Sequence, residues 1–343
     1  MNKRILAALT LLLLCGLAYT PAAPAADFSV KQTWKIGHEG GWDYLTVDPA
    51  AQVLYIARGT KVDVVDLKSG ALVTEMGPFL GTHGVALDSA GKFGYVSDGR
   101  DNSVRVFDRK SYALVARIPA GQNPDSILFE PSTQRVFAFN GRSKDITVID
   151  AANNQVLGTI AAAGKLETGQ TDGKGTVWVN IEDKNQIQRI DAKTMTVTAT
   201  WPVAPCEAPG GLAFDGVHRR LFSTCDEKKM VVTDADSGKV VATLPIGDGP
   251  DAAGFYGKDG LVFSSNGQDG TLSILQQKSA DSYTPLQTLA TQKSARTLAV
   301  DSFTGMVYLV AAKYGPAAAP TADAPRPRPA MLPDSFVVLA AGR

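Results

Sequence analysis

Charged and aromatic side chains suited to ligand binding recur at intervals along this 343-residue sequence. Acids, two imidazoles and one guanidinium around a common opening would bind a cation or a small polar molecule, because such ligands are held by several convergent polar groups. The candidates are His38, Glu39, Trp42, Asp43, His83, Asp125, Glu167, Glu207, Asp251 and Arg296. The plainer interpretation is that a solvent-filled opening has polar walls without being a site.

A second interpretation is a divalent cation, calcium or zinc, bound in a channel. Carboxylate and amide oxygens are suitable ligands, and the ion would polarise a carbonyl and lower the pKa of a bound water, as in a metal-dependent, lactonase-like hydrolase. The residues that offer such oxygens are Glu39, Asp43, Asn140, Glu167 and Asp251. Because their spacing singles out no set of four, we do not expect a required cofactor.

A third and weaker interpretation is single-stranded nucleic acid binding through aromatic and basic side chains. The residues concerned are Trp42, Arg100, Arg142, Lys144 and Arg296. The chain has 34 Lys and Arg against 34 Asp and Glu, and this balance gives no long-range attraction to phosphates. We therefore do not expect a nucleic acid partner. The sequence also lacks a Gly-x-Ser-x-Gly elbow, a phosphate-binding loop and a His-Glu-x-x-His motif.

The elements that position these side chains come from a repeat of about forty residues. In each unit a short apolar strand ends at a marker residue and further alternating strands follow, as at 146–149. The markers are Asp48, Asp88, Glu130, Asp172, Asp215, Tyr256 and Asp301, at separations of 40, 42, 42, 43, 41 and 45 residues. Seven such units predict an all-β, seven-bladed β-propeller of four-stranded antiparallel blades.

The seventh unit lacks its fourth strand. Residues 30–36 resemble the outer strands of the other units, so we expect this N-terminal strand to complete the last blade and close the ring. Blade topology then sorts the loops by face. The binding candidates come to one end of the channel, and the repeated aspartates come to the other, where we interpret them as turn formers.

The third unit carries a family resemblance. Residues 121–125 read GQNPD, residues 136–141 read VFAFNG and residues 148–150 read VID. This wording resembles the YVTN-type β-propeller repeat family, and residues 30–340 as a whole are similar to its YncE-like exported proteins. The resemblance implies a periplasmic or extracellular propeller and no agreed catalytic motif. Unit four departs from it, because residues 169–172 replace the apolar first strand, and so does unit seven.

The N-terminus predicts export. Lys3 and Arg4 precede an apolar run at 5–18, which is shorter than the about 20 residues that span a bilayer, and small residues follow. We interpret residues 1–25 as a cleaved signal peptide and residues 27–343 as one propeller domain with no transmembrane segment. Cleavage removes one of three cysteines, so we predict a structural disulfide between Cys206 and Cys225 in an oxidising compartment.

A Pro- and Ala-rich loop insertion at 313–335 interrupts the seventh unit, and its composition favours extended or disordered chain. It would cap the channel, present Arg326 and Arg328 to a partner, or be a tolerated insertion. These observations together favour a periplasmic or secreted monomer. We expect it to be a non-catalytic binding or scaffold module for a small polar ligand or an envelope protein.

Overall fold

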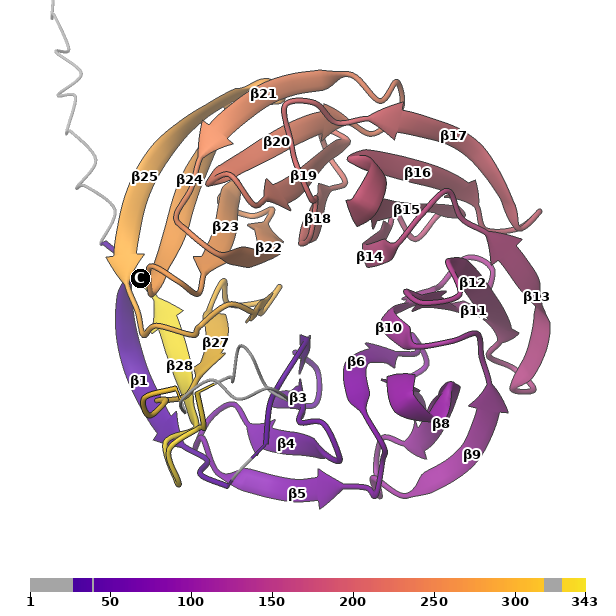
Figure 1. Ribbon diagram of the computed structural model, residues 1–343, viewed down its shortest axis with the longest axis horizontal. Coiled ribbons are helices and arrows are strands. Elements are labelled where there is room, and N and C mark those ends of the chain that lie inside the picture. Colours follow the sequence, from indigo (N-terminus) through magenta and orange to yellow (C-terminus); the bar gives the residue numbers. More distant parts are fainter. Residues whose placement is uncertain (1–26, 39, 318–328) are drawn as a thin grey trace, which may run out of the picture.

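The computed structural model describes residues 27–38, 40–317 and 329–343; the expected signal peptide, Glu39, Arg326 and Arg328 lie outside these residues. Seven four-stranded antiparallel sheets form a ring around a central channel (Figure 1). The predicted seven-bladed β-propeller is confirmed. No helix of the described residues is long and apolar enough to cross a membrane.

Blades one to six each consist of four consecutive strands, with the first strand beside the channel and the fourth on the outside (Figure 1). Blades one to three comprise β2 (Leu45–Asp48), β3 (Val53–Ala57), β4 (Val62–Asp66), β5 (Leu72–Met76), β6 (Thr82–Leu87), β7 (Phe93–Asp98), β8 (Ser103–Asp108), β9 (Leu114–Pro119), β10 (Pro124–Glu130), β11 (Arg135–Asn140), β12 (Asp145–Asp150) and β13 (Gln155–Ala161). Blades four to six comprise β14 (Leu166–Thr171), β15 (Thr176–Ile181), β16 (Gln186–Asp191), β17 (Thr196–Pro202), β18 (Leu212–Asp215), β19 (Arg220–Cys225), β20 (Lys229–Asp234), β21 (Val240–Pro245), β22 (Pro250–Tyr256), β23 (Leu261–Asn266), β24 (Thr271–Ser279) and β25 (Ser282–Ala290). Short 3-10 turns, η1 (Gly99–Asp101) and η2 (Glu182–Lys184), join the second and third strands of blades two and four.

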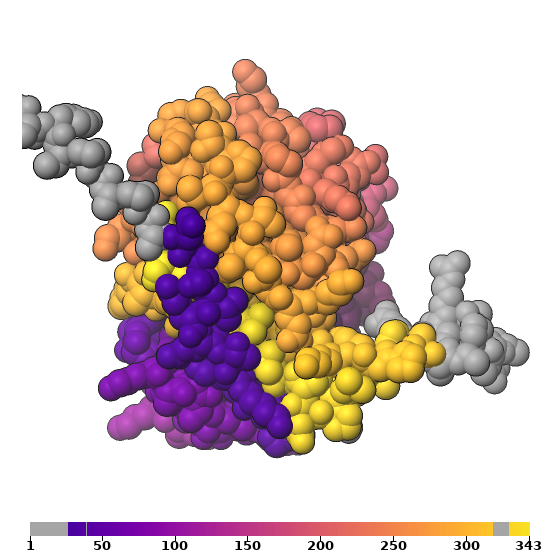
Figure 2. Space-filling model, turned by 90° about the vertical axis from the view of Figure 1, so that its left-hand side faces the viewer, coloured from indigo at the N-terminus to yellow at the C-terminus, as the bar shows by residue number. Residues whose placement is uncertain are grey.

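Blade seven combines strands from both ends of the described chain. Its strand order is β1–β28–β27–β26, from the following segments: β1 (Ser29–Lys35), β28 (Val337–Gly342), β27 (Val307–Ala311) and β26 (Leu298–Val300). β1 pairs antiparallel with β28, with Thr33 opposite Leu339. Figure 2 shows the indigo N-terminal strand running along the outside of the molecule between orange and purple residues. The predicted closure of the ring by an N-terminal strand is confirmed.

The hydrophobic core lies between neighbouring blades. In one cluster, Phe139 and Ile146 of blade three pack with Leu166 and Val179 of blade four, and all four are fully buried. The second strands are buried along their length because a neighbouring blade covers each face, as for β3 and β23. A blade is therefore stable only within the complete ring.

The repeated aspartates form turns, as their interpretation as structural residues predicts. Asp66 accepts hydrogen bonds from the N–H and hydroxyl of Ser69 at 2.7 and 2.6 Å. Asp108 accepts the same pair from Ser111 at 2.8 and 2.9 Å. Because turn donors occupy these carboxylates, the aspartates explain the local fold and not a ligand site.

The predicted disulfide is present. Cys206 lies in the link into blade five and Cys225 ends β19, and their Cα atoms are 5.3 Å apart across an S–S bond. Both residues are buried against Trp178 and Leu212. The bond fastens the link to the blade that follows it.

Candidate functional site

One position of the repeat places ionisable side chains around the channel. It lies five residues before each first-strand marker, and in chain order it holds Asp43, His83, Asp125, Glu167, Gly210, Asp251 and Arg296. Six of these seven residues are ionisable, and equivalent positions of a propeller lie at one height around its axis. We call these six side chains the charged ring, and the end of the channel at which they lie the channel mouth.

Breaks in strand pairing redirect four of these side chains. The pairing of first and second strands shifts register at 82–85, 124–127, 166–169 and 250–252, segments that contain His83, Asp125, Glu167 and Asp251. A β-bulge adds a residue to one strand and re-aims its side chain. The bulges thus explain how a charged side chain is accommodated in each of these inner strands, because the extra residue turns that side chain toward a different direction.

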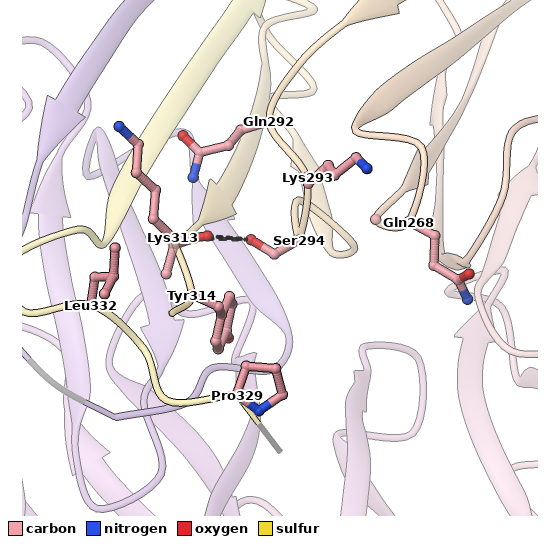
Figure 3. Close-up of a pocket in the computed structure, with 10 residues that line it drawn as sticks. Gln268, Gln292, Lys293, Ser294, Lys313, Tyr314, Pro329 and Leu332 are labelled. Carbon is pink, nitrogen blue, oxygen red and sulfur yellow. Dashed lines mark hydrogen bonds between the residues drawn. The ribbon is translucent and has the colours of Figure 1, made fainter. Parts of the chain in front are cut away.

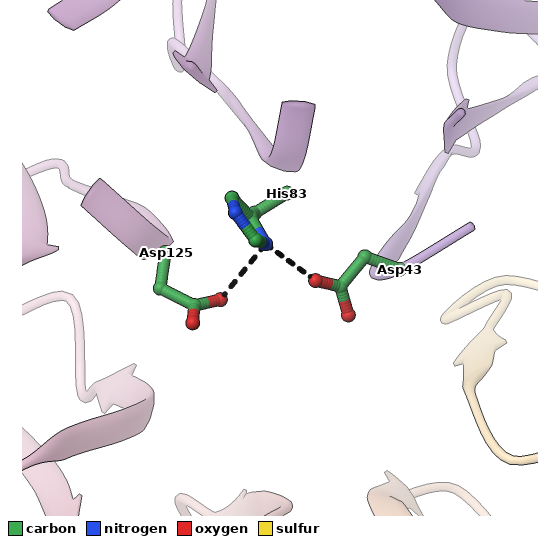
Figure 4. Close-up of side chains that lie close together, drawn as sticks. All are labelled: Asp43, His83 and Asp125. Atoms are coloured by element: carbon green, nitrogen blue, oxygen red, sulfur yellow. Dashed lines mark hydrogen bonds and ion pairs between the residues drawn. The ribbon is translucent and has the colours of Figure 1, made fainter. Parts of the chain in front are cut away.

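His83 lies between two carboxylates. Its Nδ1 is 2.7 Å from Asp43 Oδ2 and 3.5 Å from Asp125 Oδ1, and the three side chains point into the channel from blades one, two and three (Figure 4). Burial opposes the charged form of the imidazole. The hydrogen bond with Asp43 and the negative charge of Asp125 outweigh this burial, so that the pKa of His83 is raised.

Arg296 links the other side of the ring. Its guanidinium forms an ion pair with Asp251 and donates a hydrogen bond to the Trp42 carbonyl oxygen at 2.6 Å. It also lies 3.8 Å from Asp43 Oδ1, so that Asp43 stands between Arg296 and His83. A continuous series of charges therefore runs from blade six through blades seven, one and two to blade three.

Carboxylates outnumber basic side chains in the charged ring. The acids are Asp43, Asp125, Glu167 and Asp251, and the basic residues are Arg296 and His83. Lys165 and Arg100 lie beside the ring, with Lys165 Nζ 2.7 Å from Glu167 and Arg100 in the cavity that Asp43 and His83 line. Burial, and then the negative charge of Asp43, raises the pKa of Asp125 to about 6. Burial, and then Asp125, raises the pKa of Glu167 to about 8. At neutral pH a carboxyl with a pKa of about 8 is mostly protonated, so protonation of Glu167 relieves part of this negative charge, and a bound cation would favour the ionised form instead.

Tyr44 crosses the channel next to the charged ring. Its hydroxyl lies 3.3 Å from Thr168 Oγ1. Tyr44 belongs to blade one and Thr168 to blade four, which are nearly opposite in a ring of seven. Burial, and then the charge of Asp125, raises the pKa of Tyr44 well above its usual value, so the phenol stays neutral. Tyr44 is not among the residues predicted from the sequence, where its one local signal is its place directly after Asp43.

Two cavities adjoin Trp42 at the mouth. One of about 360 Å³ is lined by Trp42, Asp43 and His83, and another of about 430 Å³ by Trp42, Asp251 and Arg296. Trp42 is only 7% exposed, and its indole Nε1 has no hydrogen-bond partner among the described residues. Both cavities open beside the charged ring and are large enough for a small ligand.

A larger cavity of about 870 Å³ lies beside the mouth, against the loop insertion (Figure 3). Its walls include the apolar parts of Tyr314, Pro329 and Leu332. Residues 318–328 lie outside the described part of the chain. We assign no ligand to this cavity.

Three of the sequence candidates lie apart from the charged ring. His38 Nε2 is 3.8 Å from a glutamate of the outer strand β5. The amide of Asn140 donates to Asp145 Oδ1 at 2.7 Å within blade three, and Glu207 is exposed in the link to blade five. Of the residues predicted to bind a metal, Asp43, Glu167 and Asp251 belong to the charged ring.

The basic residues of the nucleic-acid interpretation are partly paired with acids. Lys144 Nζ lies 2.8 Å from Asp183, and Arg296 pairs with Asp251. Arg100 lines the same cavity as His83. These pairings reduce the positive charge that a polyanion would meet.

Comparisons with known proteins support the fold. No protein-family model matches this chain. A curated relative, the uncharacterized protein YncE of Salmonella typhi, is 23% identical over 195 residues, 54% of each chain, so the chain spans about half the length of that relative. This match supports the expected likeness to YncE-like propellers. The evidence for a YVTN-type repeat remains the sequence pattern described above.

Solved structures with the same architecture have little sequence in common with this chain. A hydrazine synthase chain of Kuenenia stuttgartiensis has a TM-score of 0.70 at 16% identity, over 79% of this chain and 92% of its own. The structure of U3-55K has a TM-score of 0.75 at 11% identity, over 92% of this chain and 98% of its own. At these identities the likeness shows the β-propeller fold alone.

Proposed function

We propose that this propeller binds a small, positively charged ligand at its channel mouth. The observation that carries the proposal is the surplus of carboxylates in the charged ring. A cation placed beside Asp125 and Glu167 would stabilise the ionised form of both carboxyls, whose pKa values are raised by burial, and the nearby Tyr44 hydroxyl offers a neutral hydrogen-bonding group.

The arrangement favours binding over covalent catalysis. The two cysteines of the described chain are joined in a disulfide, so neither offers a nucleophilic thiolate. Lys165 is held by Glu167 and Glu182. Burial alone would lower the pKa of Lys165, but hydrogen bonds to these two acids raise it, so its amine stays protonated and is not a nucleophile.

We also propose that the protein acts outside the cytoplasm. A disulfide between Cys206 and Cys225 persists in oxidising compartments such as the periplasm and is rare in the cytosol. This agrees with the expected signal peptide. The experiments below therefore use the chain that begins at Asp27, with its disulfide intact.

Binding is tested by thermal unfolding and calorimetric titration with spermidine and choline as cations and succinate as the anionic control. A cation at 100 times its Kd would stabilise the protein by about 2.7 kcal/mol. The double variant Asp125→Asn/Glu167→Gln should lose this stabilisation. The control Asp226→Asn/Glu227→Gln makes the same two kinds of substitution at exposed positions and should retain it.

The proposal is wrong if neither organic cation nor any divalent metal ion binds. It is also wrong if the Asp125→Asn/Glu167→Gln variant binds these cations as tightly as the wild type. Succinate binding in place of cation binding would reverse the assignment of charge.

A further inference from the structure

We propose that Asp43, His83 and Asp125 bind a divalent metal ion of the zinc class. The inference rests on the proposed function, because this ion is one of the cations that the channel mouth would attract. One ligand atom from each residue, His83 Nδ1 and one oxygen of each aspartate, lies within 4.8 Å of the other two. The three residues come from three blades, so only the closed ring brings them together.

The separations are close to those that a metal requires. Zinc lies about 2.0–2.2 Å from nitrogen and oxygen ligands, which places two ligands of a tetrahedral ion about 3.4 Å apart. His83 Nδ1 is already 3.5 Å from Asp125, whereas its distance of 2.7 Å to Asp43 Oδ2 must increase by about 0.7 Å on this geometry. A small rotation of one carboxylate provides this change.

Neighbouring residues hold these side chains in place. Arg296 lies near Asp43 Oδ1, at 3.8 Å, and this leaves Oδ2 for the metal. The imidazole packs against Gly99, where an added Cβ would lie 2.7 Å from His83 Nε2. The ion pair and the close packing against Gly99 restrict how these two side chains can turn.

A second observation concerns Trp42, which lines this cavity with Asp43 and His83 and also lines the neighbouring cavity with Asp251 and Arg296. Its buried indole Nε1 has no acceptor among the described residues. A buried donor without an acceptor costs free energy, so such donors are normally satisfied by protein, water or a bound group. A water or anion that completes the coordination of the metal would provide an acceptor in this cavity.

The ligand set favours zinc over calcium. Calcium takes about six to eight oxygen ligands, and an imidazole nitrogen does not suit it. One imidazole and two carboxylates suit zinc or cobalt, and three protein ligands leave one position for a water or a small ligand. The sequence alone leaves calcium and zinc open as ligands, and the imidazole of His83 in the cluster favours zinc.

The test is calorimetric titration of the chelator-treated protein with Zn²⁺, Co²⁺ and Ca²⁺, together with the visible spectrum of the Co²⁺ form. We expect one Zn²⁺ or Co²⁺ per chain and no competition by Ca²⁺. His83→Ala and Asp125→Asn each remove a metal ligand and should weaken binding by more than about 100-fold, because the loss of an outer partner alone costs about 10–100-fold.

His218→Ala is the matched control. His218 Nδ1 also lies 2.7 Å from a carboxylate, Asp215, but the pair is at the turn after β18 and outside the charged ring. This variant should bind Zn²⁺ like the wild type. Urea unfolding of each variant shows that loss of binding is not loss of the fold.

The metal site is refuted if the wild type binds neither Zn²⁺ nor Co²⁺, if Ca²⁺ binds in their place, or if His83→Ala retains wild-type affinity. If neither Zn²⁺ nor Co²⁺ binds, the contacts of His83 are explained by an imidazolium that pairs with the two carboxylates. If spermidine or choline still binds, the proposed function survives the failure of the metal site. If no cation of either kind binds, both proposals are wrong.

Discussion

Closure of the ring by β1 predicts a large loss of stability when Phe28 is replaced by alanine. Phe28 is 4% exposed and packs edge-on against Phe263 of blade six, with ring centroids 5.6 Å apart. Its backbone N–H donates to the Gln287 side chain at 2.9 Å, and its carbonyl oxygen accepts from the same amide at 2.8 Å. Phe28 therefore joins the N-terminal strand of blade seven to the outer strand of blade six.

The expected decrease in the free energy of unfolding is about 3–5 kcal/mol, the range for Phe→Ala in a protein core. The cavity cannot collapse easily, because the strands on both sides are held by their own hydrogen-bond ladders. This decrease is a large part of the about 5–15 kcal/mol that typically stabilises a domain. Deletion of residues 27–36 removes the whole strand and should be more severe.

The assay is urea unfolding of the oxidised protein, followed by tryptophan fluorescence. The matched control is Val73→Ala on the outer strand β5, where the valine is 49% exposed, and its free energy of unfolding should stay within about 0.5 kcal/mol of the wild type. If Phe28→Ala unfolds at the same urea concentration as Val73→Ala, the N-terminal strand does not hold the ring closed and the reasoning is wrong.

Three further predictions use the same assay. Replacing both cysteines of the 206–225 disulfide by serine should cost about 3 kcal/mol, because the bond closes a loop with a sequence separation of 19; an unchanged midpoint would contradict this. Gly211→Ala should lower the free energy of unfolding by about 1–3 kcal/mol, because a Cβ there would lie 2.6 Å from the backbone of blade six. The control is Gly41→Ala, which should be neutral because no atom lies within 4 Å of its added Cβ. Equal urea midpoints for the two variants would refute the packing argument. Hydrogen bonds from the hydroxyl and N–H of Ser69 lower the pKa of Asp66 in the folded state, so its stabilisation is complete above about pH 4 and is lost as the pH falls through the folded pKa. Asp66→Asn should therefore reduce the loss of stability in acid, and an identical pH profile would exclude this contribution.

The fold was predictable because each unit encodes its own strands and turns. Alternating residues form the strands, and aspartates such as Asp66 supply the acceptor for the next turn, all within about forty residues. The missing fourth strand of the last unit and the strand-like segment at 30–36 together predicted the closure seen between β1 and β28. The departure at Gly169–Thr171 did not remove a strand, because these residues still pair with β15.

The charged ring was predictable only as a set of positions. His38 and Asp43 lie in the same link, yet the backbone turns at His38 with a φ of 61°, and its side chain lies near β5. The pairing of His83 with Asp43 and Asp125 depends on bulges that shift the register by one residue, and no simple periodicity reveals such a bulge. The contact of Tyr44 with Thr168 joins residues 124 positions apart.

By itself the sequence determined the number of blades, their order and the closing strand, and it predicted that ionisable residues gather at one end of the channel. These features follow from a short repeated pattern whose interactions are local. Only the tertiary structure decided which charges touch and how strongly burial perturbs them. The reason is that contacts across a channel depend on the radius and closure of the whole ring, to which all seven blades contribute at once.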